Sequence, residues 1–295
     1  MINLHTQSEG HYKLETLDAN GNVTRSTGWM PNLILDQGLL RMGANNDYLN
    51  VCSVGSGVST PQPSNTALQS KLAQSSTVSE VVNGAQAEAP YYAYSRRTFT
   101  FASGSVVGLV GELAVGWGGN AGQLFSRALV RNANGTQQAM PVLADETLRV
   151  TYEHRYYPMI TDTTGVLTIS GPIGGQYEYI IRPAMVSTAT QWTANNTQNN
   201  GARLSVTAYN GEIGSITEQP TGNRLTMSGV NGTVSGTTAI FSHSYENPNL
   251  NVSGGIRSLM FAMGNGAWQV QFTPAIPKDA DSSLRLQFSH TWGRR

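Results

Sequence analysis

The chain has few charged residues and a single cysteine, and it lacks any long hydrophobic run. Charged side chains make up 12% of its 295 residues, about half the share typical of soluble globular proteins. Because Cys52 stands alone, an intrachain disulfide framework is excluded, and we expect Cys52 to be a small buried residue. No stretch approaches the roughly 18 apolar residues that a membrane-spanning helix needs, so we expect no membrane insertion.

The charges that are present cancel, since the formal net charge is zero. No global field therefore favours nucleic acid, and we expect no nucleic-acid partner. Near-zero net charge promotes association, which suits a protein that sits in an assembly. The N-terminus lacks the charged and apolar blocks of a signal peptide, so we expect the chain to begin at Met1 and to be made in a cytoplasm.

What the sequence has in abundance is glycine, with 32 residues, together with polar turn formers and β-branched side chains. This mixture favours short strands joined by tight turns and an all-β fold with little helix. Strand-like stretches are His11–Thr16, Asn22–Trp29, Thr98–Ala102, Leu113–Trp117, Phe125–Val130 and Tyr177–Pro183. Hairpin signals are Asn20-Gly21, Asn134-Gly135, Asn231-Gly232 and Asn265-Gly266. Two helices are expected, at Asn32–Met42 and Asn65–Leu72.

The chain also repeats itself. Residues 141–156 and 277–292 share, without a gap, Pro141, Ala144, Asp145, Leu148, Arg149 and His154, which recur as Pro277, Ala280, Asp281, Leu284, Arg285 and His290. Weaker matches precede them in the same order: Gly10–Lys13 with Gly175–Glu178, and Arg97–Gly108 with Arg224–Gly236. A period near 140 residues is too long for a solenoid and indicates domain duplication.

We therefore expect two tandem, homologous β-sandwich domains of jelly-roll-like type, at residues 1–157 and 158–295. The second copy has little to match residues 57–92, which we expect to be an extra segment of the first copy. Each repeated motif alternates with period two and predicts a long last strand. Its inner face carries Leu148 to Tyr156, or Leu284 to Trp292, at every second position, and its outer face is expected to meet water.

The repeated polar residues invite a catalytic or metal-binding interpretation, but the structural one is stronger. His154 and His290 lie on inward faces with no second histidine, cysteine or aspartate at ligand spacing. Asp145 with Arg149, and Asp281 with Arg285, are expected to be structural pairs in which an aspartate caps the turn before the last strand.

Other motifs that could carry chemistry are incomplete. The run from Asp18 to Asn22 opens like a calcium loop without the closing acidic residue. The carboxylates form no legible pair for acid–base catalysis; they are Glu88, Glu112, Glu146 and Glu153. Three tyrosines could line a glycan surface or an inter-subunit contact: Tyr91, Tyr92 and Tyr94. The sequence thus predicts no catalytic residue, no cofactor and no metal site.

A family resemblance adds to this interpretation. The segments Asn32–Leu39, Val54–Pro61 and Asn65–Leu68, followed by Arg97–Phe101, Glu112–Trp117, Phe125–Leu129 and Val142–Tyr152, resemble a pattern of tailed-bacteriophage structural proteins. The resemblance spans most of residues 10–157, and only its skeleton returns in 165–295. It implies a virion protein of the tail, tail fibre or neck and no catalytic residues.

Two functions follow as expectations. The first is a non-enzymatic bacteriophage virion protein of the tail or neck that joins other virion proteins, exposes a host-facing surface and forms a homo-oligomer, a trimer or a hexamer. The alternative is a tail-fibre module that binds a host receptor or glycan. A polysaccharide-cleaving enzyme is disfavoured, because such enzymes need a carboxylate pair or a metal set.

Overall fold

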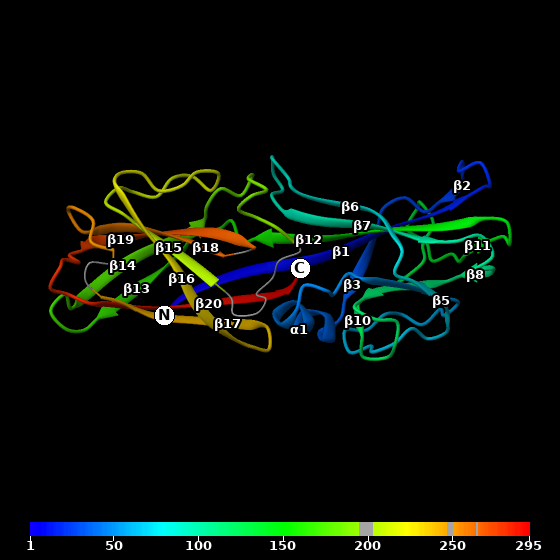
Figure 1. The fold of residues 1–295 in the computed structure, drawn as a ribbon, viewed down its shortest axis with the longest axis horizontal. Helices are drawn as coiled ribbons and strands as arrows, with labels where there is room; N and C mark the ends of the chain where they lie inside the picture. The colour runs from blue at the N-terminus through cyan, green and yellow to red at the C-terminus, as the bar shows by residue number, and fades with distance from the viewer. Residues whose placement is uncertain (195–202, 247–249, 264) are drawn as a thin grey trace. The chain divides into compact units, whose positions relative to one another are not determined.

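The computed structural model describes residues 1–194, 203–246, 250–263 and 265–295 (Figure 1). The expectation of an all-β fold is confirmed, since 54% of the chain is strand and 3% is helix. The described residues contain twenty strands and one helix, α1 (Asp36–Ala44). The expected strands are present near their predicted ends, with two exceptions: His11–Thr16 is the second part of the longer β1 (Ile2–Leu17), and Asn22–Trp29 shortens to β2 (Val23–Ser26).

Two local predictions are wrong. The expected helix at Asn65–Leu72 is a turn followed by β5 (Lys71–Ser75). There the Asn65 carboxamide oxygen accepts from the Gln62 amide at 2.9 Å, and the Ser70 amide donates to the Glu112 carboxylate at 2.7 Å. Such side-chain bonds compete with helical ones. The expected turn at Asn231-Gly232 is instead the point where β16 (Arg224–Ser235) exchanges one partner strand for another.

The chain divides into two compact units, each assembled from segments that are distant in the sequence. Unit 1 comprises Met1–Gln7, Gly84–Ala93 and Tyr156–Gly293, and unit 2 comprises Ser8–Asn83, Tyr94–Arg155 and Arg294–Arg295. This division differs from contiguous halves at 1–157 and 158–295. The first residues belong to unit 1 because they bond to its last strand; the Ser289 hydroxyl, for example, donates to Asn3 Oδ1 at 2.6 Å.

Unit 2 contains two antiparallel sheets joined by a shared strand. The first runs in the order β3 (Met30–Ile34), β10 (Leu124–Leu129), β9 (Glu112–Gly116), β4 (Val51–Gly55), β5. The second contains β2, β1 (Ile2–Leu17), β12 (Thr147–Pro158) and β7 (Ala93–Phe101). Strand β3 also pairs with β1, so it links the sheets. Beside β7 lies β6 (Val78–Ala85), and a separate ribbon pairs β8 (Gly108–Val110) with β11 (Met140–Val142).

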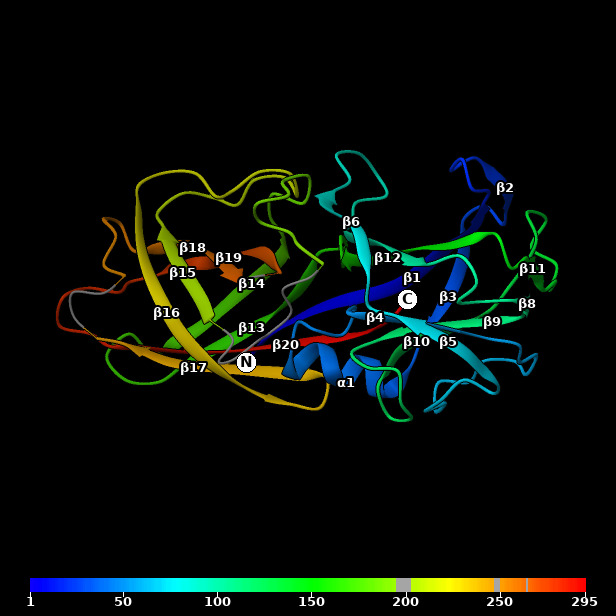
Figure 2. The same cartoon turned by 45° about the vertical axis from the view of Figure 1, so that its right-hand side comes forward.

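Unit 1 is likewise a sandwich of two sheets (Figure 2). One runs in the order β13 (Thr163–Ile169), β14 (Gly175–Pro183), β19 (Gly266–Ile276), β18 (Ile256–Met263), β15 (Arg203–Tyr209), β16. The other begins with the far half of β16 and continues through β17 (Thr238–Tyr245) and β20 (Leu284–Arg294) to the first residues of β1.

The strand pairings of the two units correspond in chain order. In unit 2, β3–β10–β9–β4–β5 matches β14–β19–β18–β15–β16 of unit 1, and β7–β12 matches β17–β20. Residues 71–85, which pass from β4 to β7, thereby have a counterpart in β16, so the segment 57–92 is not wholly extra. The repeated motif falls on corresponding strands, β12 and β20. Duplication itself stays a prediction.

The earlier sequence matches fall on strands that do not correspond in this way. Gly10–Lys13 lies in β1, whereas Gly175–Glu178 lies in β14, the counterpart of β3. Similarly, Arg97–Phe101 ends β7, whereas Arg224–Ser235 forms β16, the counterpart of β5 and β6. Of the quoted matches, the terminal motif is therefore the one that pairing supports.

The inner faces of β12 and β20 form the cores, as their alternation predicts. Leu148 and Leu284 are fully buried, as are the other inward side chains or nearly so: Val150, Tyr152, His154, Tyr156, Leu286, Phe288, His290 and Trp292. The expectation of a wet outer face is wrong for β12. Thr151 and Glu153 are buried there because β7 lies alongside, with the Thr98 and Thr151 hydroxyls 3.3 Å apart.

Candidate functional site

The two repeated histidines are embedded in the cores. In unit 2, His154 packs edge-on against the rings of Tyr48 and Phe125, and the Tyr48 hydroxyl lies 3.4 Å from its Nδ1. In unit 1, His290 Nε2 lies 3.0 Å from the Thr6 hydroxyl and 3.1 Å from the Tyr156 hydroxyl. Burial, with a smaller contribution from His5, lowers the pKa of His290 to about 3, so this imidazole is neutral at pH 7. Within the described residues no three His, Cys, Asp or Glu side chains gather as a metal site would require.

The predicted aspartate–arginine pairs are wrong. Asp145 and Asp281 are exposed; Arg149 bonds to Glu15 at 2.8 Å, and Arg285 donates to the Ser242 hydroxyl at 3.3 Å. Successive side chains of a strand point to opposite faces of the sheet. Each arginine therefore reaches a residue of a neighbouring strand and does not point back to the preceding turn.

In unit 2 the turn before β12 is instead held by Glu146, which is almost fully buried. Its carboxylate accepts from the Thr24 hydroxyl at 2.6 Å and from the Leu143 amide at 3.0 Å, and it bonds to Arg25 at 2.7 Å. The bond from Thr24 is the main contribution that lowers the pKa of Glu146. The carboxylate that holds this turn therefore belongs to Glu146 and not to Asp145, the residue predicted for this role.

An ion pair between β9 and β10 of unit 2 has both of its charged side chains buried. Glu112 is 0% exposed and Arg127 is 2% exposed, and Arg127 donates to Glu112 Oε2 through Nε at 3.0 Å and Nη2 at 2.7 Å. Neither charge could remain in the interior without such a partner. The sequence carried a signal that was missed, because both residues interrupt strands that are otherwise buried throughout.

This ion pair holds the loop between β4 and β5, residues 57–70, which we name the anchored loop. The carboxylate of Glu112 accepts from the loop amides of Gly57, Gln69 and Ser70 at 2.7–3.2 Å. From the other side, Arg127 donates to Asn65 Oδ1 at 2.7 Å and to the Ser59 hydroxyl at 2.9 Å. A side chain at position 57 would collide with Glu112, whose Oε1 lies 2.2 Å from where a Cβ would stand, so glycine is required. The loop is thus fixed by buried charge.

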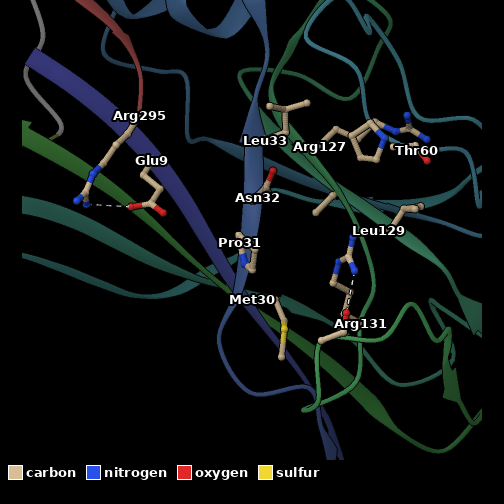
Figure 3. Close-up of a pocket in the computed structure, with 13 residues that line it drawn as sticks. Glu9, Met30, Pro31, Asn32, Leu33, Thr60, Arg127, Leu129, Arg131 and Arg295 are labelled. Atoms are coloured by element: carbon tan, nitrogen blue, oxygen red, sulfur yellow. Dashed lines mark hydrogen bonds and ion pairs between the residues drawn. The ribbon is translucent and has the colours of Figure 1, made fainter.

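A cleft of about 510 Å³ borders the anchored loop (Figure 3). It opens where β3 changes its partner strand: Met30–Asn32 pair with β1, and Leu33 and Ile34 pair with β10. Thr60 and Pro61 of the anchored loop line it together with Met30–Leu33 of β3 and Arg127–Leu129 of β10. Its charged lining residues include Glu9, Arg131 and Arg295, and Arg295 lies 3.7 Å from Glu9. A mostly apolar cleft of this size accommodates a few side chains of a partner.

The anchored loop begins a long stretch without a fully buried side chain, in which Leu68 packs against the cluster of Leu35, Ala114 and Leu124. Residues 58–92, all of which the structure describes, contain no buried side chain although they include β5 and β6. Apolar side chains stand in solvent there, with Val58 63%, Leu72 46% and Val81 51% exposed. Only three charges accompany them, at Lys71, Glu80 and Glu88. Exposed apolar groups on a surface this poor in charge are typical of a contact with another chain.

A second feature of unit 2 is an aromatic stack on the surface. The guanidinium of Arg96 lies 5.3 Å from the ring centre of Trp29 and 5.4 Å from that of Tyr94. Arg96 is held by Glu153, which accepts from its Nε at 2.8 Å, and Trp29 remains 40% exposed. In unit 1, Tyr92 packs on Tyr157 with ring centres 5.2 Å apart, and Tyr91 is half-buried. Tyr94 thus belongs to the stack of unit 2, whereas Tyr92 packs on Tyr157 within unit 1.

Comparisons with family models, curated proteins and solved structures found no match to this chain. Among the described residues, no helix has the length and hydrophobicity needed to cross a lipid bilayer.

Proposed function

We propose that this chain is a non-enzymatic structural protein of a tailed-bacteriophage particle, located in the tail or neck. It joins other virion proteins, exposes a host-facing surface and works as a homo-oligomer, a trimer or a hexamer. The observation that carries the proposal is the surface formed by residues 58–83 of unit 2, which is ordered by backbone pairing and a buried ion pair but exposes Val58, Leu72 and Val81. The resemblance to tailed-bacteriophage structural proteins is the reason for assigning this surface to a phage particle.

The energetics of this surface favour assembly. Ordering a loop during binding consumes free energy, whereas the anchored loop is already held by Glu112 and Arg127. Burial of Val58, Leu72 and Val81 against a partner would remove exposed apolar area from water, at roughly 25 cal/mol per Å². The cleft beside Pro61 continues this contact surface and offers a recess for partner side chains.

The carboxylates considered for catalysis have structural roles where they are buried. Glu112 bonds to Arg127, Glu146 to Arg25, and Glu153 to both Arg96 and Arg155. Each joins strands or loops that are distant in the sequence. This use of carboxylates favours a scaffold over an enzyme.

The proposal is tested on purified particles of the virus that encodes the chain. Mass spectrometry should detect the protein there in a fixed copy number that is a multiple of three. In particles complemented with variants, Leu72→Asp and Val81→Asp should lower incorporation at least tenfold, because both introduce charge into the contact surface. Val107→Asp is the matched control, since Val107 is 55% exposed outside residues 58–92. Absence of the protein from particles, or equal incorporation of all three variants, would contradict the proposal.

The second candidate, a module that binds a host receptor or glycan, is favoured by the stack of Trp29, Arg96 and Tyr94. A half-exposed indole beside a fixed guanidinium offers both an apolar face and hydrogen-bond donors. Binding to a glycan array that is lost in Trp29→Ala would support this candidate. Binding to no glycan by either protein would argue against it.

A further inference from the structure

Strand β13 of unit 1 is an edge strand with an unusual composition. All seven of its residues pair with β14 without a register shift, from Thr163 opposite Ile181 to Ile169 opposite Gly175. Among the described strands, β14 is the partner registered against it, so its outer backbone groups face away from the sheet. None of its side chains is buried.

Natural sheets protect such edges with charges, prolines, bulges or covering segments. The sequence of β13, Thr-Thr-Gly-Val-Leu-Thr-Ile, has no charge and no proline, and its register is unbroken. Thr164, Val166 and Thr168 are exposed, and Val166 is 57% exposed. On the same face, Ile180 of β14 pairs with Thr164 and is 37% exposed, beside a shallow recess of about 380 Å³. An edge of this kind is suited to pairing with another strand.

The face of β13 that carries Thr164, Val166 and Thr168 points to a second copy of the chain as the partner. These three exposed residues read Thr-Val-Thr and are symmetric about Val166. In a two-fold antiparallel pair centred on Val166, Val166 faces its own copy and Thr164 faces Thr168 of the second chain. Opposed threonines and opposed valines are favourable cross-strand pairs, and no like charges meet. We propose that β13 joins two copies of this chain by antiparallel edge-to-edge pairing about Val166.

The pairing is isologous, so it closes on itself and yields a dimer, and does not propagate as a filament. Three such pairs would make a hexamer, whereas a trimer with three-fold symmetry alone would not use this contact. The inference goes beyond the proposed function and does not depend on it, since it concerns unit 1 and requires no other virion protein.

Cysteine cross-linking of the full chain tests both the contact and its register. The native Cys52 is fully buried, so an introduced thiol on β13 is the accessible one. Under mild oxidation Val166→Cys should form a covalent dimer, because the two cysteines face each other. Thr164→Cys is the matched control and should form no covalent dimer. Its two copies would lie about 13 Å apart along the strands, beyond the roughly 7 Å that a disulfide spans. The double variant Thr164→Cys/Thr168→Cys should again cross-link.

Sedimentation supplies a readout without cysteine chemistry. The unmodified chain should sediment in a concentration-dependent equilibrium that includes dimers. Val166→Lys should weaken that association at least tenfold, because it opposes two positive charges, whereas Val23→Lys, at a valine 49% exposed on β2, should not. Equal cross-linking at 164 and 166, no cross-linking at 166, or unchanged association of Val166→Lys would overturn the inference. If β13 pairs instead with a strand of a different protein, Val166→Cys would form no cross-linked dimer.

Discussion

The two units fix the same loop with different chemistry. In unit 2 the loop between β4 and β5 is held by the buried pair of Arg127 and Glu112. In unit 1 the corresponding loop, between β15 and β16, is held by Gln269, which is 0% exposed. The carboxamide of Gln269 accepts from the Gly214 amide at 2.9 Å and donates to the Ser215 carbonyl at 2.8 Å. Arg127 and Gln269 lie on corresponding strands, β10 and β19.

The two units share a strand order, and the contrast shows which features are the same in both units and which differ. The alternation of apolar residues on β12 and β20 is kept, and with it the buried faces of both units. The polar group that satisfies the loop backbone changes from a charged pair to a neutral amide. Backbone groups in the interior need partners, but an ion pair and a carboxamide can both provide them. The charged solution makes unit 2 the more sensitive to single substitutions.

The largest difference between the units is expected when each anchor is removed. Arg127→Met should lower the free energy of unfolding by about 3–5 kcal/mol, because it leaves the Glu112 carboxylate buried without its counter-charge. Gln269→Met should lower it by about 1–3 kcal/mol, the range for unsatisfied neutral groups. Urea denaturation of the full chain measures both.

A double variant sharpens this comparison. In Arg127→Met/Glu112→Gln the uncompensated charge is gone, so stability should recover in part. Equal losses for Arg127→Met and Gln269→Met, or a loss below about 1 kcal/mol for Arg127→Met, would contradict the charged anchoring of unit 2.

The corresponding core positions should respond alike. Leu148→Ala and Leu284→Ala should each lower the free energy of unfolding by about 2–5 kcal/mol, because both side chains are fully buried on the last strand of a sandwich. Thermal and chemical denaturation of the two variants provide the values. A change near zero for either leucine would remove it from the core and end the correspondence of β12 with β20.

A smaller effect is expected from pH, and it concerns unit 1. The pKa of His290 is lowered to about 3 by burial, with His5 adding to the shift. Between pH 6.5, near the ordinary histidine pKa, and about pH 3, His290 binds a proton in the unfolded chain but not in the folded chain. Stability should therefore fall on acidification through this window, by up to about 1.4 kcal/mol per pH unit.

Replacing His290 by Gln should reduce this slope while lowering stability at pH 7; burial also lowers the pKa of His5 and His11, so part of the slope remains. Unfolding followed at pH 6.5, 5.5 and 4.5 measures the slope. An unchanged pH dependence in His290→Gln would show that His290 is not the group responsible.

Local patterns in the sequence predicted much of the fold. Period-two alternation gave the inner faces of β12 and β20, since each residue's face depends only on its neighbours along the strand. The first helix was predicted at Asn32–Met42 and is present at Asp36–Ala44, while Asn32–Ile34 belong to β3. The second helix failed because the Glu112 carboxylate, distant in sequence, captures the amides of Gln69 and Ser70.

Long-range pairing explains the other errors. The first residues join unit 1 through bonds to β20, such as the one between His5 and Thr291, which lie 286 positions apart in the sequence. Arg149 bonds to Glu15, 134 positions away, and not to nearby Asp145. Nothing in the spacing of a single sequence encodes such partners. The candidate site was predicted only as an exposed, charge-poor segment, because its anchors, Glu112 and Arg127, meet through the register of β9 and β10.

The central claim is that residues 58–83 of unit 2 form a contact surface within a virus particle. A reconstruction of the intact particle by electron cryomicroscopy tests it most directly. The account predicts density for this chain in the tail or neck, with Val58, Leu72 and Val81 covered by a neighbouring protein. Density in which residues 58–83 face solvent in every copy, or a particle that lacks the chain, would contradict it.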